Sequence, residues 1–260
     1  MRRLLLAIFT CALVVQDARG AELRLAVAAN FNAPMRELAA AFEQDTGHVL
    51  KIAPGASGKL YAQIRQGAPY DLFFSADQNK PAALVRDGLA LGDSRYTYAS
   101  GRLVLWTRRP DYHADEIRRA LSQSEGRIAV ANARIAPYGA AAEQVLGALG
   151  LADQLRPRLV YGESVSQAYQ FAASGNARFG LVAASVVMRD GAFVTGSGIL
   201  VPQTLHGPVL QDAVVLTRSQ FPQAAMAFLA YLHTNPAQQI ISRYGYMMPT
   251  PPVMSRDTVL

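Results

Sequence analysis

The sequence Pro54-Gly55-Ala56-Ser57-Gly58-Lys59-Leu60 joins an apolar run at 49–53 to a segment with helical spacing of apolar residues, and so predicts a strand-to-helix turn. The first N–H groups of a helix have no acceptor inside it, and the helix dipole adds partial positive charge there, so such turns suit anions. Gly55 and Gly58 let the backbone approach a ligand, and Ser57 adds a hydroxyl. A serine here is also a common N-cap, so the turn alone leaves both interpretations open.

Comparable turns occur at Asn30, Tyr138 and Val165. Short apolar runs, typical of strands buried on both faces of a sheet, lie at residues 23–28, 49–53, 70–74, 128–131, 159–161 and 179–183. Helices are predicted after these runs, with Asn30 or Asn32 and Ser164 among the N-caps. Strands that alternate with helices in this way predict an α/β fold with a mostly parallel sheet, in which ligands bind beyond the carboxyl ends of the strands.

Two such sets of elements are joined by longer strands, which predicts two lobes with a cleft between them. One long strand is expected at 98–107, and a return strand at 209–217 is followed by two helices capped by Ser219 and Asn235. We expect residues 21–100 with 212–260 to form lobe 1. Residues 104–204 then form lobe 2, with hinge strands near 98–107 and 205–214.

The first twenty residues have the pattern of a cleavable signal peptide. Arg2 and Arg3 precede an apolar segment at 4–15, and Ala18-Arg19-Gly20 is a small-x-small cleavage site before Ala21. The chain is therefore expected to be exported. No later run is long and apolar enough to span a bilayer, so we expect no membrane insertion. Cys11 is the only cysteine and lies in this leader, which predicts no disulfide and no cysteine metal site.

The charge of the chain is mild. Its 25 basic and 19 acidic residues give +6, and loss of the leader with Arg2, Arg3, Arg19 and Asp17 leaves +4. The arginines occur singly or in pairs, without a basic run or interleaved aromatic residues, so a nucleic-acid partner is not expected.

An enzyme is not expected either. The Gly55-Ala56-Ser57-Gly58 segment is one residue too short for a nucleophile elbow, and Ala53 stands where a P-loop needs its first glycine. The four histidines are widely spaced, and none is in a metal-binding pattern. An exported hydrolase that uses Ser57 remains the remote alternative.

Several motifs in a fixed order resemble one known family. They are Ala28-Ala29-Asn30-Phe31, Gly55-Ala56-Ser57-Gly58-Lys59-Leu60-Tyr61-Ala62-Gln63-Ile64, Gly67-Ala68-Pro69-Tyr70-Asp71-Leu72-Phe73-Phe74-Ser75-Ala76-Asp77, Gly101-Arg102-Leu103-Val104-Leu105-Trp106, Ala136-Pro137-Tyr138-Gly139-Ala140-Ala141 and Gly180-Leu181-Val182-Ala183. Over essentially the whole exported chain, the sequence resembles the periplasmic molybdate-binding proteins of ABC transporters, which have the two-lobed type II periplasmic binding protein fold.

The resemblance implies which residues bind the oxyanion. Asn30 would offer side-chain and backbone donors, Ser57 its hydroxyl and N–H, and Tyr138 and Val165 only their N–H groups. Ala29, Gly58 and Ser166 are candidates for additional contacts. Many members have a tyrosine hydroxyl where this chain has Ala183, so that contact is expected to be absent. The resemblance implies neither a cofactor nor a metal cation bound by protein ligands.

The chemistry of the four turns agrees with an oxyanion. A fully ionised tetrahedral dianion offers only acceptors, so its site needs donors and must lack carboxylates. None of the four contact positions is acidic, and Glu163, the nearest acid, is expected to point outward. Phosphate keeps a proton at neutral pH, and leaving that proton unpaired costs about 1 to 3 kcal/mol.

The resemblance also implies a place in the cell and a partner. The protein is expected in the periplasm as a monomer that delivers molybdate, and also tungstate, to the membrane permease of an ABC importer. A receptor for sulfate, thiosulfate or another small oxyanion is the main alternative, because the expected tyrosine is missing. Pocket size, which separates these anions, is not visible in a sequence.

Overall fold

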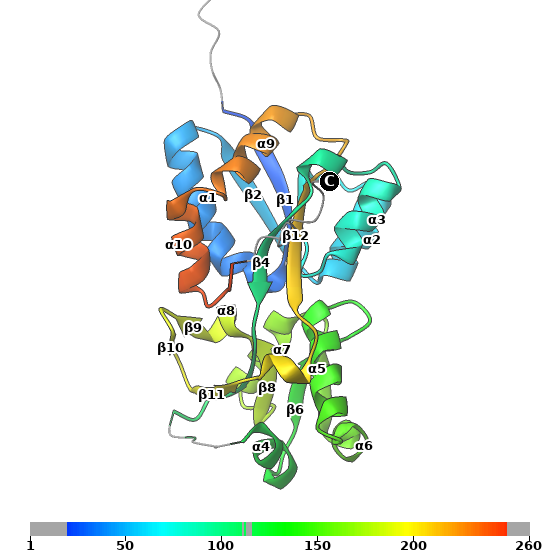
Figure 1. The fold of residues 1–260 in the computed structure, drawn as a ribbon, viewed down its shortest axis with the longest axis vertical. Helices are drawn as coiled ribbons and strands as arrows, with labels where there is room; N and C mark the ends of the chain where they lie inside the picture. Colours follow the sequence, from blue (N-terminus) through cyan, green and yellow to red (C-terminus); the bar gives the residue numbers. More distant parts are fainter. Residues whose placement is uncertain (1–19, 111, 113–115, 249–260) are drawn as a thin grey trace, which may run out of the picture.

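The computed structural model describes residues 20–110, 112 and 116–248. The predicted signal peptide, apart from Gly20, and the proline-rich tail after Met248 lie outside the described residues. Two lobes are stacked along the long axis of the molecule, and each is built on a five-stranded sheet (Figure 1). The two-lobed α/β fold expected from the sequence is therefore confirmed.

The sheet of lobe 1 combines parallel and antiparallel strands. Its order is β2 (Val49–Gly55), β1 (Glu22–Ala28), β3 (Leu72–Phe74), β12 (Val209–Val215) and β4 (Tyr96–Gly101). The first three strands are parallel, and β12 runs antiparallel to both of its neighbours. The parallel strands therefore end together at the edge that faces lobe 2 (Figure 1).

Helices cover both faces of this sheet. They are α1 (Asn32–Thr46), which follows the 3-10 turn η1 (Ala29–Phe31), α2 (Ser57–Arg65), α3 (Asn79–Arg86), η2 (Gly92–Ser94), α9 (Pro222–Tyr231) and α10 (Asn235–Arg243). Strand side chains alternate between the faces. Leu25 and Val27 pack with α1, α9 and α10, whereas Ala26 packs with Leu60 of α2 and Leu84 of α3.

The sheet of lobe 2 has the order β11 (Ser197–Leu200), β5 (Leu103–Thr107), β8 (Phe179–Ala183), β6 (Ile128–Ala131) and β7 (Leu159–Gly162). The last three are parallel, whereas β5 is antiparallel to β8 and β11. The other elements of the lobe are α4 (Ile117–Gln123), α5 (Pro137–Ala148), α6 (Ala152–Leu155), η3 (Arg156–Arg158), α7 (Val165–Ala173), α8 (Ala184–Val187), β9 (Met188–Arg189), β10 (Ala192–Phe193) and η4 (Gln203–Leu205).

The strand predicted at 98–107 is two strands in two different sheets. The chain leaves lobe 1 at the end of β4 and enters lobe 2 with β5, and Arg102 lies at the break. The Arg102 Nε atom donates a hydrogen bond to the Gly245 carbonyl oxygen at 2.8 Å. Residues 98–101 and 103–107 are buried on either side of the break, so a single arginine between them does not mark the end of a strand. The chain returns to lobe 1 before β12, so the two crossings between the lobes lie side by side at Gly101 and Val209, where the sequence predicts the hinge strands (Figure 1).

Several helices begin at other residues than predicted. Neither Asn30 nor Asn32 caps α1, because Phe31 holds the N-cap position. Ser57 is the first residue of α2, after Ala56. Phe221 and Thr234, rather than Ser219 and Asn235, precede α9 and α10 at the cap.

Ser164 is the N-cap of α7, as predicted, and its Oγ atom accepts a hydrogen bond from the Gln167 N–H at 3.3 Å.

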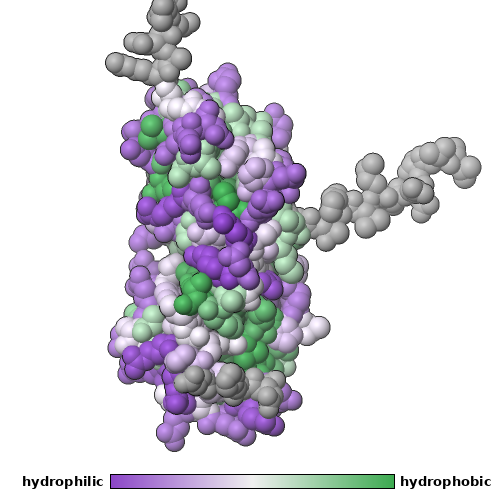
Figure 2. All heavy atoms as spheres, turned by 90° about the vertical axis from the view of Figure 1, so that its left-hand side faces the viewer, coloured by the Kyte–Doolittle hydropathy of each residue, from purple (hydrophilic) through white to green (hydrophobic). Residues whose placement is uncertain are grey.

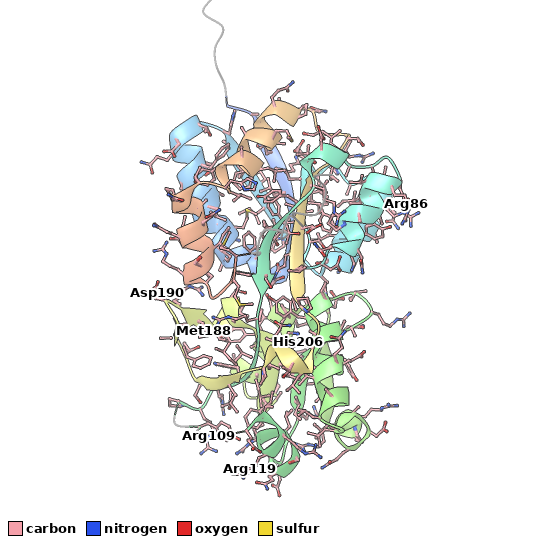
Figure 3. All side chains as sticks on the ribbon, in the orientation of Figure 1. Arg86, Arg109, Arg119, Met188, Asp190 and His206 are labelled. Carbon is pink, nitrogen blue, oxygen red and sulfur yellow. The ribbon has the colours of Figure 1, made fainter. Side chains whose placement is uncertain are left out.

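The outer surface shows where the paired arginines lie. Arg109 and Arg119 are exposed at the far end of lobe 2, and Arg86 lies on the outer side of α3 (Figure 3). On the face that carries α1, α10 and β10, apolar side chains form separate groups among hydrophilic ones (Figure 2). Within the described ranges, every helix is too short or too polar to cross a lipid bilayer.

Candidate functional site

A small cavity lies between the two lobes, where the first turns of four helical segments meet. Its lining residues are Ala28, Ala29, Asn30, Gly55, Ala56, Ser57, Ala76, Ala136, Pro137, Tyr138, Ser164 and Val165. The structure therefore brings Asn30, Ser57, Tyr138 and Val165, all predicted from the sequence, around one space. They come from η1 and α2 of lobe 1 and from α5 and α7 of lobe 2.

The cavity is closed around a very small volume. The centre of a water molecule has ≈ 10 Å³ to move in, which is room on the scale of one water. Asn30, Ser57, Tyr138 and Val165 are each at most 3% exposed. In this arrangement of the lobes, the space is much smaller than a sugar or an amino acid, and it is also smaller than an anion with four oxygens.

Backbone N–H groups are the main donors at this cavity. Ser57 and Val165 are the first residues of their helices, and Tyr138 is the second of α5, so their N–H groups have no acceptor inside the helix. Among the described residues, none of these three N–H groups donates to a loop or side-chain acceptor. N–H donors at the positive ends of three helix dipoles therefore face one space, which favours negative charge there.

Ser57 adds a hydroxyl whose orientation is fixed. Its Oγ atom accepts a hydrogen bond from the Ala76 N–H at 3.0 Å, and Ser57 is 1% exposed. Because a lone pair of Oγ is occupied by Ala76, the hydroxyl hydrogen is left to donate to a ligand. Ser57 is not the N-cap of α2, so the capping interpretation of this serine is wrong.

The Asn30 side chain is already engaged within the protein. Its Nδ2 atom donates to Gln211 Oε1 and to the Tyr246 hydroxyl, both at 2.8 Å. The Asn30 carbonyl oxygen accepts from the Ser185 hydroxyl at 2.8 Å and the Tyr246 hydroxyl at 3.0 Å. The side-chain donor expected at Asn30 is therefore not free, and its backbone N–H is the group left for a ligand.

The ring of Tyr138 is directed away from the cavity. Its hydroxyl accepts a hydrogen bond from Gln211 Nε2 at 3.3 Å, and an added Cβ on Gly101 would lie 2.0 Å from the same oxygen. This agrees with the expectation that Tyr138 contributes its N–H alone. Ala183 is buried in the core of lobe 2 and does not line the cavity.

The three additional candidates divide into two groups. Ala29 lines the cavity, but its carbonyl oxygen accepts a hydrogen bond from the Ser166 hydroxyl at 3.1 Å. The Gly58 N–H donates to the Ile135 carbonyl oxygen at 2.8 Å. Gly58 and Ser166 therefore bridge the lobes beside the cavity and do not line it.

Four residues behind the cavity were not found from the sequence. They are Gln211, Tyr98, Tyr246 and Ser185, all of them buried, and they hold Asn30 and Tyr138. They lie far apart in the sequence and in no motif, so no local signal marks them.

Among the residues that the structure describes, no charged side chain lines the cavity. The nearest ion pairs are Lys59 with Glu163 on one side, at 3.1 Å, and Lys80 with Asp77 on the other. Glu163 is exposed, as predicted. Burial raises the pKa of Tyr138 and of Tyr98 well above the usual value, so both stay neutral.

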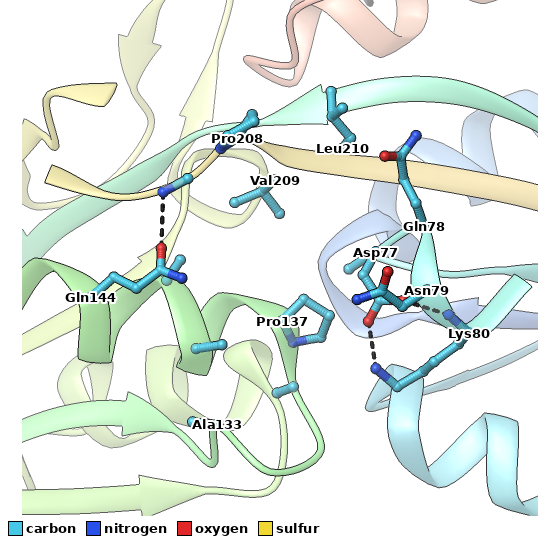
Figure 4. A pocket seen from close by; sticks show the side chains of 15 residues that line it. Asp77, Gln78, Asn79, Lys80, Ala133, Pro137, Gln144, Pro208, Val209 and Leu210 are labelled. Atoms are coloured by element: carbon cyan, nitrogen blue, oxygen red, sulfur yellow. Dashed lines mark hydrogen bonds and ion pairs between the residues drawn. The ribbon is translucent and has the colours of Figure 1, made fainter. Parts of the chain in front are cut away.

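A larger pocket beside the cavity is less suited to an anion. It offers ≈ 370 Å³ by the same measure and is shown in Figure 4. Asp77 and Lys80 pair within it, and Gln144 accepts a hydrogen bond from the Gly207 N–H at 2.8 Å. Its carboxylate and its width make it a poorer site for a small anion than the cavity between the helix N-termini.

The surroundings of Ser57 do not support a nucleophile. Its Oγ atom accepts a hydrogen bond from an N–H donor, and the described part of the cavity lining contains no histidine, carboxylate or lysine to act as a base. Within the described residues, no group of three or more His, Cys, Asp or Glu side chains is placed to hold a metal ion. The site is built to donate hydrogen bonds to a small anion.

Comparison with known proteins agrees with this geometry. Residues 23–247 match the family described as bacterial extracellular solute-binding protein. The chain belongs to this family. Two relatives named molybdate-binding protein ModA, from Azotobacter vinelandii and Rhodobacter capsulatus, are each 45% identical to it. The matches cover 88% of this chain in both cases, and 91% and 90% of the relatives.

A solved structure of a solute-binding protein has the same fold. The Azotobacter vinelandii periplasmic molybdate-binding protein superposes with a TM-score of 0.85 at 39% identity, over 88% of this chain and 100% of that one. These relatives are binding proteins, which supports a binding role for this solute-binding protein as well.

Proposed function

We propose that this protein binds molybdate, and also tungstate, in the cavity between its lobes, as the solute-binding component of an ABC importer. The observation that carries the proposal is the convergence of helix N-termini from both lobes on one buried, uncharged cavity. The two 45% identical relatives that are named molybdate-binding proteins support the same ligand.

The hydrogen-bond donors of the cavity and its lack of acidic side chains explain a preference for fully ionised dianions. A dianion without protons can accept a hydrogen bond from every donor at the cavity, and no carboxylate repels it. Hydrogen phosphate would bring a proton that finds no free acceptor, which costs about 1 to 3 kcal/mol. Hydrogen bonds to a charge are strong here because closure removes water.

Entry of a ligand requires the lobes to move apart, because the cavity has room only on the scale of one water. An anion with four oxygens is larger than this space, so the lining must shift slightly around a bound ion. We infer that the ligand selects a closed state in which both lobes contact it, since it can favour only the state that it binds better. The closed state is then the form that a membrane permease recognises.

The cellular setting follows from the same proposal. We propose export to the periplasm with a signal peptide at residues 1–20, cleavage before Ala21 and action as a monomer without catalytic activity or cofactor. Mass spectrometry of the exported protein tests the cleavage site, and light scattering tests the oligomeric state.

Calorimetric titration with molybdate, tungstate, sulfate and phosphate in parallel tests the ligand. We expect binding of molybdate and tungstate, and much weaker binding of phosphate. Tighter binding of sulfate than of molybdate would instead assign the protein to the other oxyanions. Absence of binding by all of these ions would overturn the proposal.

A further inference from the structure

Gln211 is a fully buried polar residue at the hinge. It lies on β12 beside the irregularity in pairing with β4, between Gln211 and Asp212. Its Oε1 atom accepts hydrogen bonds from Asn30 Nδ2 at 2.8 Å and from the Tyr98 hydroxyl at 3.0 Å, and its Nε2 atom donates to the Tyr138 hydroxyl at 3.3 Å. Burial of a side-chain amide costs little free energy of folding only when its polar atoms are hydrogen-bonded in this way.

Two of the three partners carry groups of the proposed anion site. Asn30 precedes α1 in lobe 1, and Tyr138 lies in the first turn of α5 in lobe 2. Both line the cavity, whereas Gln211 does not. The Gln211 side chain therefore connects the lobe 1 part of the site to the lobe 2 part without lining the cavity itself.

The fit around this connection leaves little room for movement. An added Cβ on Gly101 would lie 2.0 Å from the Tyr138 hydroxyl oxygen and 2.6 Å from Gln211 Nε2. Asn30 is fixed further by the Ser185 hydroxyl, which reaches its carbonyl oxygen from lobe 2. When the lobes move apart, the bonds from Gln211 to Asn30 and Tyr98 stay within lobe 1, while the bond to Tyr138 must break.

We propose that Gln211 is a positioning residue for anion binding, which aligns Asn30 and Tyr138 across the hinge so that their N–H groups face the same cavity in the closed state. This inference rests on the proposed function. Every side chain in the group is neutral: Gln211, Asn30, Ser185, Tyr98, Tyr138 and Tyr246. A charge of the same sign as the ligand would repel it from this place through a medium of low dielectric constant.

Gln211→Glu tests the neutrality of this position. Its molybdate Kd should rise with pH as the buried carboxyl ionises, whereas the wild-type Kd stays constant over the same range from about pH 6 to 9. Thermal unfolding of the ligand-free protein is measured at each pH. A purely structural role would lower the melting temperature and leave the ratio of variant to wild-type Kd independent of pH.

Gln211→Met keeps the size of the side chain and removes its three hydrogen bonds. We expect molybdate binding to weaken by about five- to a hundredfold, the effect of leaving buried partners unpaired. Gln78→Met is the matched control, because the Gln78 amide bonds only to Thr97 and Asp212 within lobe 1 and does not line the cavity. That variant should keep the wild-type Kd.

Tyr138→Phe tests the same link from lobe 2 and keeps the backbone N–H of residue 138. We expect a loss of about two- to twelvefold in affinity, as for one hydrogen bond, and no additional loss when it is combined with Gln211→Met. This conservative change still tests the role of Gln211 in anion binding if the Gln211 variants do not fold. Wild-type affinity in Tyr138→Phe, or wild-type affinity and pH profile in folded Gln211 variants, overturns the inference. If the wild-type protein does not bind molybdate, the proposed function is wrong, and the role of Gln211 is not what failed.

Discussion

The Gly58 N–H of lobe 1 donates a hydrogen bond to the Ile135 carbonyl oxygen of lobe 2 at 2.8 Å. This is a direct backbone contact between the lobes, next to the cavity that Ser57 lines. An added Cβ on Gly58 would lie 2.9 Å from both the Cα and the carbonyl oxygen of Ile135. Since both of those atoms belong to the backbone, the glycine permits an approach that a larger residue prevents.

Gly58→Ala should therefore weaken molybdate binding without destabilising the ligand-free protein. Overpacking by one methyl group costs about 1 to 3 kcal/mol, or roughly five- to 150-fold in Kd, and only the closed state bears this cost. In the open state, alanine is the better helix former in α2. Calorimetry and thermal unfolding measure the two effects. Gly147→Ala is the control, because an added Cβ meets nothing within 4 Å there. Equal affinities for Gly58→Ala and wild type would show that the lobes need not approach so closely.

Lys59 and Glu163 form an exposed ion pair across the cleft, with side chains 56% and 68% exposed. Exposed pairs contribute about 0.2 to 1 kcal/mol and are screened by salt. We expect Lys59→Met to weaken molybdate binding by less than about tenfold, because it removes both the pair and a positive charge near the anion. Glu163→Gln should weaken it less, since one repulsive charge is lost as well. Titrations at low and high salt check this, and an effect that does not shrink with salt would contradict the electrostatic explanation.

Ser57→Ala should weaken molybdate binding by about 1.5 to 3 kcal/mol, or roughly ten- to 150-fold, the range for a hydrogen bond to a charged group. The same change leaves the buried Ala76 N–H without its acceptor, so the melting temperature should fall too. Ser174→Ala removes a hydroxyl from the exposed end of α7 and serves as the control. A Ser57→Ala protein with reduced stability and unchanged Kd would remove Ser57 from the anion site.

The turns at the site could be predicted from the sequence because they are local. Gly55, Ser57 and Gly58 stand between a strand and a helix, and Ser164 has its partner three residues later. The carboxyl ends of parallel strands meet at one edge of a sheet, so turns that follow such strands lie close together in space. The fold class follows from these short-range patterns, whereas the four cavity positions were implied by the resemblance to the molybdate-binding family.

Contacts between residues far apart in the sequence could not be predicted in the same way. Gln211 reaches Asn30 across 181 positions and Tyr138 across 73, and no periodicity links such positions. For this reason, the hydrogen bonds from the Asn30 side-chain amide to Gln211 and Tyr246 were not predicted. The break at Arg102 was also missed, because Arg102 stands alone between two buried segments, 98–101 and 103–107.

Burial of Tyr98 gives the protein a specific sensitivity to alkaline pH. Tyr98 is 2% exposed, and burial, as the largest cause, raises its pKa well above the usual value. Above about pH 10, the unfolded chain releases this proton while the folded protein keeps it, so the free energy of unfolding falls by about 1.4 kcal/mol per pH unit for each such group. The stabilising contribution is therefore complete below about pH 10 and is lost as the pH rises further.

Tyr98→Phe should reduce this slope by the contribution of one group, about 1.4 kcal/mol per pH unit. Urea unfolding of the ligand-free protein at a series of pH values from about 8 to 11 measures it, with Tyr98→Phe compared to wild type. The variant also loses the bond to Gln211, so its stability is lower at every pH, and the slope is the informative quantity. Tyr161→Phe removes the hydroxyl of a tyrosine that is 51% exposed and is measured beside it as the control. Parallel curves for Tyr98→Phe and wild type would show that Tyr98 ionises as easily in the folded protein as in the unfolded chain.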